Sequence, residues 1–238
     1  MFLCQQKINV QLDYTRVLSF NAGFVDTACF LALHGVFAAH ITGNFVTLAA
    51  GIVTNEPSGT IAKILALPVF CIVVFLIRFF DDILKLFHRS AYNALLQLQI
   101  LLFAVAAIIS FIFLPFPATD TPASIAVALF LIAAMAIQNA MQEEYWHQQA
   151  PTTVMTGATV KLMLKLADYI SPANQKDKSF IMDKIRLSFP RIIWFCLGCI
   201  LAGIFYKHAL SWIFVPPFIV MLFAYRIRNS QLDNSSIS

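Results

Sequence analysis

The polar residues best suited to chemistry in this chain stand inside or beside long apolar runs. Asp26 lies within the run Val17 to Ala39, and His40-Ile41-Thr42-Gly43-Asn44 follows it directly. A carboxylate deep in a bilayer costs about 2.5–3.5 kcal/mol on insertion scales, so it usually faces a partner or a water-filled cavity. Burial raises a carboxyl pKa, which makes Asp26 our candidate for substrate binding and proton coupling. The alternative is a neutral acid that hydrogen-bonds Asn139 or a backbone carbonyl.

The segment from Thr42 to Asn44 is suited to starting a helix inside a membrane. Glycine permits close backbone approach, and a Thr or Asn side chain can cap unpaired N–H groups. Exposed amides at a helix N-terminus carry partial positive charge and bind anions or carbonyl oxygens. We therefore expect Thr42, Gly43 and Asn44 to bind a solute, with His40 as a gate. Capping without a ligand, and simple solvation of His40 at the interface, are the alternatives.

A second copy of this motif occurs in the other half of the chain. Met155 to Leu162 matches Ile41 to Leu48 at four of eight positions, including Thr156 and Gly157. Gln138 and Asn139 precede it, as Asp26 precedes the first copy. We expect Thr156, Gly157, Gln138 and Asn139 to line the same binding site. Polar side chains in lipid also hydrogen-bond neighbouring helices, which is the alternative for Gln138 and Asn139.

The composition places these motifs in an integral membrane protein. Of 238 residues, 60% are hydrophobic and 12% are charged, whereas a soluble domain is about 45–50% apolar. A spanning helix needs about 20 mainly apolar residues. Six segments approach this requirement: Val17 to Ala39, Ile61 to Phe80, Ala94 to Leu114, Ala123 to Glu143, Ile192 to Tyr206 and Ala209 to Tyr225. The net charge of +4 requires no nucleic-acid partner.

Charge distribution predicts the orientation of these spans. With the N-terminus in the cytoplasm, all but Lys63 and Lys207 of the 16 Lys and Arg residues fall on the cytoplasmic side. Cytoplasmic loops are enriched in Lys and Arg. The bias therefore predicts an even number of spans, with both termini in the cytoplasm.

Three spans in each half imply that the halves enter the membrane from opposite sides. We expect an all-α, single membrane domain over 1–238, built from inverted repeats at 13–114 and 122–228, with a disordered polar tail at 229–238. Each repeat would carry a half-helix after its first span. The first would cover Phe45 to Val53, and the second, Ala158 to Ala167, would lie near the cytoplasmic interface.

The motifs resemble those of a known family. Ala22 to Asp26, His40 to Asn44, Gln138-Asn139 and Thr156-Gly157 together are similar to the YoaK family, also called DUF1275. The resemblance covers nearly the whole chain and is most specific over the first two motifs. It implies a small bacterial inner-membrane protein of about six spans, described at most as a permease. It implies no substrate and no functional residues.

Two functions from different classes fit these observations. The first is a small secondary transporter or permease for a small polar or anionic solute, with Asp26 coupling transport to protons. The second is a non-transporting scaffold or regulatory protein whose polar residues hold helices together. The sequence predicts no enzyme, cofactor or metal site. Gly198 and Ala202, four residues apart, would allow close helix approach, and we expect a homodimer.

Overall fold

The computed structural model describes residues 2–54, 58–87, 91–146, 152–171 and 178–236 of the chain. Side chains are described within 14–54, 58–87, 91–145, 152–171 and 178–227. Over these residues the fold is all-α, as the sequence predicts. The helices are α1 (Phe2–Ala32), α2 (Gly43–Thr54), α3 (Thr60–Leu86), α4 (Tyr92–Phe113), α5 (Pro122–Trp146), α6 (Met155–Ile170), α7 (Lys178–His208), the short 3-10 helix η1 (Leu210–Trp212) and α8 (Val215–Ser236).

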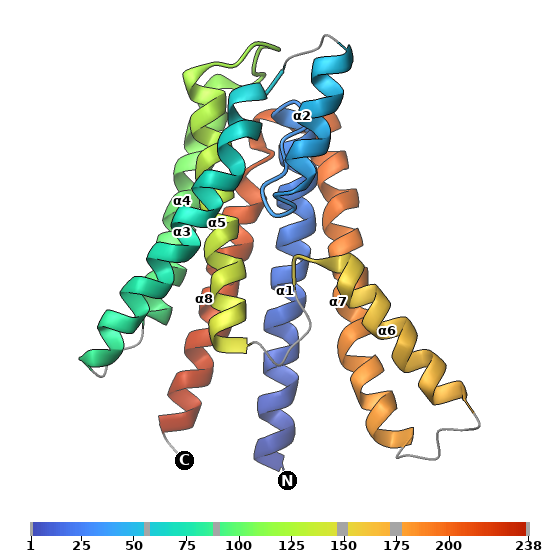
Figure 1. The fold of residues 1–238 in the computed structure, drawn as a ribbon. Helices are drawn as coiled ribbons and strands as arrows, with labels where there is room; N and C mark the ends of the chain where they lie inside the picture. Colours follow the sequence, from blue (N-terminus) through green and yellow to red (C-terminus); the bar gives the residue numbers. More distant parts are fainter. Residues whose placement is uncertain (1, 55–57, 88–90, 147–151, 172–177, 237–238) are drawn as a thin grey trace.

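The long helices run side by side in alternating directions (Figure 1). The start of α1 and the end of α8 lie at the same end of the bundle, which we call the terminal end. Helix α1 packs against α7 and α8, whereas α5 packs against α3 and α4. Helices α4 and α8 touch each other, while α1 and α5 make few direct contacts. The bundle therefore has two groups of helices, α1 with α7 and α5 with α3 and α4. Helix α8 contacts both groups, through α1 and α4.

Five of the described helical segments are long and apolar enough to cross a membrane: Thr60–Leu86, Tyr92–Phe113, Pro122–Tyr145, Lys178–His208 and Leu210–Ile227. They confirm a polytopic membrane protein and correspond to five of the six expected spans. The remaining one, Val17 to Ala39, falls on α1, which is not among the five and which carries Arg16, Asn21 and Asp26. Its last seven residues are not helical, because the chain turns back after Ala32.

The two half-helices are present, and both are somewhat longer than expected. Helix α2 packs on α3, and α6 packs on α7. Each begins partway along the bundle, and the two run toward opposite ends (Figure 1). Helix α2 ends at the end opposite the termini, and α6 ends near the terminal end.

Two predictions for the second half of the chain are wrong. The helix expected over Ile192 to Tyr206 begins at Lys178 instead and continues through Pro190. Proline lacks one backbone donor and can persist in a helix where neighbours stabilise it. The tail expected to be disordered instead continues α8 as far as Ser236.

Helices α1 and α7 approach each other closely through two glycines. A Cβ atom added at Gly23 would lie 2.2 Å from the carbonyl oxygen of Phe195, and one added at Gly198 would lie 2.1 Å from that of Phe20. Gly198 and Ala202 are both buried in this contact. The small residues that we expected to pair with a second copy therefore pack inside the chain. They no longer support the prediction of a homodimer.

Candidate functional site

Asp26 lies inside α1, and the chain that follows α1 folds back onto it. The helix ends where Leu33 N–H donates to Cys29 O and Gly35 N–H donates to Phe30 O. Positive φ angles at His34 (55°) and Gly35 (83°) then reverse the chain direction. Gly35 accepts this conformation without the strain that a Cβ atom would cause. We call residues 33–42 the first re-entrant loop.

The Asp26 carboxylate holds this loop from within. Its Oδ1 atom accepts hydrogen bonds from Ala38 N–H (2.9 Å) and Ala39 N–H (2.6 Å), and its Oδ2 atom pairs with His40 Nδ1. Asp26 is 3% exposed, whereas the His40 side chain is 38% exposed. The expected alternative partner, Asn139, is not one of its hydrogen-bond partners.

Asn44 closes the same loop from its other end. Its side chain accepts a hydrogen bond from Phe37 N–H (2.8 Å) and donates to the carbonyl oxygens of Phe37 (2.9 Å) and Ile41 (3.1 Å). Thr42, by contrast, is exposed at the start of α2. Asn44 therefore holds the loop that precedes α2, and its side chain does not accept from the first N–H groups of α2 as the sequence predicted.

His40 connects this site to α7. Its ring packs edge-on against Phe37 and Phe195, with centroids 6.3 Å and 6.0 Å away. Phe195 in turn lines a groove between α6 and α7. His40 therefore contacts both the buried carboxylate in α1 and a residue of α7 that lines this groove.

A second polar site, which we call the Gln138 site, lies where α5 ends. Gln138 Nε2 donates to Leu18 O in α1 (3.2 Å) and to Thr152 Oγ1 (3.1 Å), and its Oε1 accepts from Gln99 Nε2 in α4 (3.4 Å). Gln142 Oε1 accepts from both the N–H (2.8 Å) and the hydroxyl (2.6 Å) of Thr152. These buried side chains tie three helices to the segment that leads into α6.

Asn139 completes the hold on that segment. Thr153 Oγ1 donates to Asn139 Oδ1 (2.5 Å), while Asn139 Nδ2 donates to Met135 O within α5 (2.9 Å). We call residues 152–154 the second re-entrant loop. The alignment that pairs Thr42 with Thr156 also pairs Ala38 and Ala39 with Thr152 and Thr153. Both loops are therefore held by a polar side chain of the preceding helix at matching positions.

The two Thr-Gly turns differ in their surroundings. A Cβ atom at Gly43 would lie 2.9 Å from the Phe37 ring, whereas one at Gly157 would meet nothing within 4 Å. Thr156 lines the groove between α6 and α7, whose volume is about 680 Å³, and Thr42 is not among its lining residues. The first turn is closed and the second is open.

Asn21 is a buried amide between the two sites. It lies on α1 one turn from Leu18, which accepts the bond from Gln138, and it is 0% exposed. Neither polar atom of its side chain has a hydrogen-bond partner in the described part of the protein. An unsatisfied buried amide is costly, so this position is suited to a bound water molecule or a polar solute atom.

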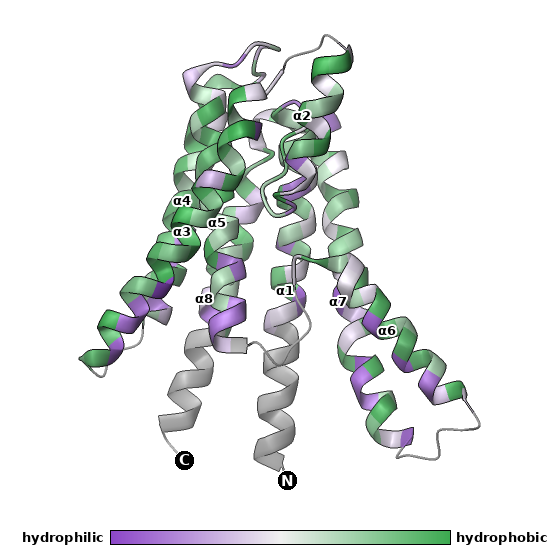
Figure 2. Cartoon of the chain, in the orientation of Figure 1, coloured by the Kyte–Doolittle hydropathy of each residue, from purple (hydrophilic) through white to green (hydrophobic). Residues whose placement is uncertain are grey.

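A charged cluster joins α3 and α5 near the terminal end, where hydrophilic residues gather (Figure 2). Lys85 Nζ lies 2.7 Å from Asp81 and 2.6 Å from Glu144, and Arg78 pairs with Glu144 and, at 3.3 Å, with Asp82. Glu144 in α5 therefore bridges to two basic residues of α3.

The predicted site residues thus fall into two groups. Asp26, His40 and Asn44 form the first site, and Gln138 and Asn139 form the second. Thr156 and Gly157 flank the open groove. Sequence reasoning missed Gln99, Gln142, Thr152 and Thr153, although the alignment extended three positions toward the N-terminus would have indicated the two threonines.

Comparison with known proteins places this geometry in a family. Residues 15–226 match the model of a family described as "Protein of unknown function (DUF1275)". The chain belongs to the DUF1275 family. It is also 29% identical, over 206 residues, to UPF0700 transmembrane protein YoaK of Bacillus subtilis (strain 168), an alignment that covers 83% of this chain and 86% of that protein. The family resemblance inferred from the motifs is confirmed. No solved structure matches the chain significantly.

The match covers both re-entrant loops and the helices that hold them. A DUF1275 chain of this kind is a multi-pass membrane protein, and its apolar helices contact the lipid bilayer.

Proposed function

We propose that this DUF1275 protein is a small secondary transporter of the bacterial inner membrane, with both termini in the cytoplasm. It moves a small polar or anionic solute between α1 and α5, coupled to a proton at Asp26. The observation that carries this proposal is the pair of re-entrant loops. They reach the interior from opposite ends, and each is held by buried polar side chains. Irregular backbone at membrane depth is tolerated only where protein buries it or where it lines a cavity.

The packing pattern supports inverted repeats of three spans each, with α1 as the sixth span. If α1, α2, α3 and α4 are exchanged with α5, α6, α7 and α8, every major contact maps onto another. The contact of α1 with α7 becomes that of α5 with α3, and the contact of α2 with α3 becomes that of α6 with α7. Inverted repeats with discontinuous helices are the architecture of many secondary transporters.

The chemistry of the two sites suits a polar solute. The amides at the start of α6 carry partial positive charge, and Gly157 beside them faces open space. The unpartnered amide of Asn21 offers both a donor and an acceptor. Together they favour a solute that carries an oxyanion or a carbonyl group.

Proton coupling rests on the pairing of Asp26 with His40. The carboxylate accepts bonds from three groups, and the partly exposed imidazole can take up a proton from the groove side and share it with Oδ2. Protonation of Asp26 would weaken its bonds to the amides of Ala38 and Ala39. The loop would then be freer to move when the proton is bound than when it is absent.

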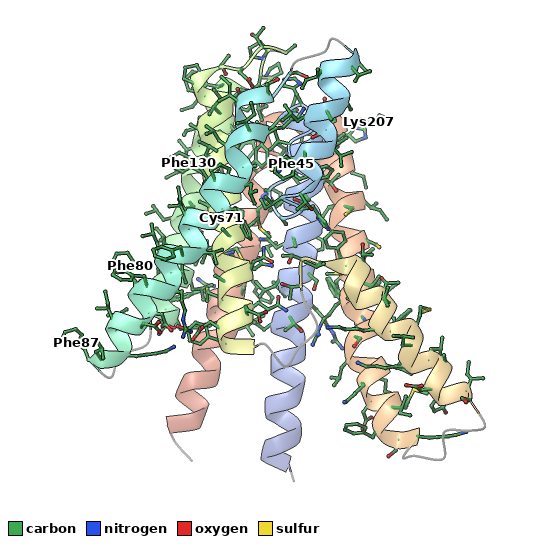
Figure 3. The ribbon with its side chains drawn as sticks, viewed as in Figure 1. Phe45, Cys71, Phe80, Phe87, Phe130 and Lys207 are labelled. Carbon is green, nitrogen blue, oxygen red and sulfur yellow. The ribbon has the colours of Figure 1, made fainter. Side chains whose placement is uncertain are left out.

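Two-sided access to the Thr-Gly turns tests the proposal without knowledge of the solute. Thr42→Cys and Thr156→Cys would be made in a chain whose five native cysteines are replaced. A membrane-impermeant maleimide is then applied to intact cells and to inside-out vesicles. Alternating access predicts that at least one position is labelled from both sides. Lys207→Cys, at the end opposite the termini (Figure 3), serves as the one-sided control.

The scaffold function is the competing proposal, and the Gln138 site favours it. There, nearly every polar atom bonds another helix or loop within the chain, as structural residues do. Labelling of both Thr-Gly positions from one side only, as for Lys207→Cys, would reject transport and favour the scaffold.

Proton coupling is tested separately. Proteoliposomes that contain a pH indicator would be offered carboxylates, amino acids and inorganic anions. A solute that dissipates the proton gradient with the parent protein should fail with Asp26→Asn.

A further inference from the structure

The groove between α6 and α7 has an apolar floor that is open to the membrane. It holds about 680 Å³, and its lining includes Val160, Leu164, Ile192 and Phe195. Several of its aliphatic side chains are exposed, Leu164 at 62% and Val160 at 54%. Helix α6 rests mainly on α7 along this groove. Such a surface excludes water and accepts a hydrocarbon chain.

A cluster of basic side chains stands at the end of the groove nearest the terminal end of the bundle. Lys165 lies half-buried on the stripe of α6 that faces α7, which also carries Ala158 and Leu162. Burial is the main cause of a lowered pKa at Lys165, and three nearby cations lower it further: Lys184, Arg191 and Lys161. Arg191 precedes Ile192 on α7 but is 5% exposed and donates from Nε to Thr15 Oγ1 in α1 (3.2 Å). Lys184 lies two turns earlier on α7. We call these four residues the basic cluster.

The lysines of this cluster have no carboxylate partner within the described residues. Asp168 and Asp183 are close in sequence and exposed, but neither forms an ion pair with Lys161, Lys165 or Lys184. Lys184 instead lies over the ring of Phe180, 4.2 Å from its centroid. No carboxylate within the described residues therefore balances the repulsion between these three lysines, and an anion at this position would relieve it.

We propose that the groove and the basic cluster form a binding site for one anionic phospholipid. An acyl chain lies along Ile192 and Phe195, and the phosphate group lies between Lys165 and Lys184. The two features match a lipid in the order that a bilayer requires, with apolar surface toward the interior and cations toward the terminal end (Figure 2). Each Lys or Arg near an anionic membrane surface contributes about 1 kcal/mol to such binding. This proposal does not depend on transport.

Native mass spectrometry of the purified chain in a neutral detergent tests the site. The probes are dioleoyl-phosphatidylglycerol, the zwitterionic dioleoyl-phosphatidylcholine with the same acyl chains, and free glycerol phosphate. We expect phosphatidylglycerol to bind best. Lys165→Gln and Lys184→Gln should each weaken it about fivefold, and Val160→Trp, which fills the groove, should weaken both lipids.

Lys207→Gln is the matched control, because it removes the same charge from the opposite end of α7 and should leave binding unchanged. Equal binding of the two lipids would overturn the proposal, as would equal losses in Lys184→Gln and Lys207→Gln. If free glycerol phosphate binds as tightly as the lipid, the site takes a soluble anion and the groove has no part in it. Circular dichroism of each variant distinguishes lost binding from lost folding.

Discussion

The bond between Asp26 and the first re-entrant loop yields the sharpest prediction about stability. Asp26 is 3% exposed and accepts hydrogen bonds from two backbone amides and from His40. Asp26→Asn keeps one oxygen for the amides and loses the charge that faces His40, which should cost about 1.5–3 kcal/mol. Asp26→Ala leaves both amides and the imidazole without this partner, which should cost about 3–5 kcal/mol.

The measurement combines reversible unfolding in detergent with hydrogen exchange. Exchange should accelerate most at the amides of Ala38 and Ala39, and more in Asp26→Ala than in Asp26→Asn. A double-mutant cycle with His40→Ala should give a coupling of about 0.5–3 kcal/mol. If the two Asp26 variants lose equal stability, show no coupling to His40 and leave loop exchange unchanged, the carboxylate does not hold the loop and the reasoning fails.

Three further predictions concern packing and polar contacts elsewhere. Gly198→Ala should destabilise the chain by about 1–3 kcal/mol in the same unfolding assay, because the new methyl group meets the backbone of α1,. Gly203→Ala on the same helix meets nothing within 4 Å and should instead stabilise it by about 0.5–1 kcal/mol,; equal effects would contradict the close approach. Asn44→Ala removes three hydrogen bonds and should raise proteolysis of the first re-entrant loop. Glu144→Gln should lower the unfolding temperature in low salt but hardly at all in high salt, because screening weakens exposed ion pairs; a salt-independent loss would contradict this.

Apolar length and glycine-containing polar turns made much of the fold predictable. Helix α2 was expected because nine apolar residues after a Thr-Gly turn are too short to cross a bilayer, and the observed helix is only three residues longer. Asp26 was expected to have a partner because an isolated carboxylate is costly at that depth. Both inferences use local composition, which a sequence displays directly.

The partner itself could not be predicted in the same way. His40 lies fourteen residues beyond Asp26 and meets it only because the chain reverses at His34 and Gly35. That reversal depends on two backbone angles, one of them at a residue that rarely adopts positive φ. Likewise, the small residue Gly198 predicts a close helix contact, but the sequence does not say whether the other helix belongs to the same chain.

The continuity of α7 was missed for a related reason. Pro190 and the charged residues before it break the apolar pattern, so the pattern predicts a helix that begins only at Ile192. In the structure, Arg191 donates from Nε to Thr15 Oγ1 in α1 (3.2 Å), and this tertiary contact supports the helix where its hydropathy is weakest. Hydropathy indicates which residues can lie in lipid, whereas the continuity of α7 through Pro190 depends on its contact with α1.

The difference between the two re-entrant loops bears on how transport would work. In the first half, Asn44 and Asp26 fix the loop by six contacts, and Gly43 is close to Phe37. In the second half, Ala158 stands at the position that matches Asn44, and Gly157 faces open space. Under the transport proposal, this is a conformation closed at the end opposite the termini and open beside α6. The only carboxylate in either loop site, Asp26, then lies on the closed side, so protonation acts on the closed loop and not on the open one. Release of the first loop is therefore the step that a proton would control.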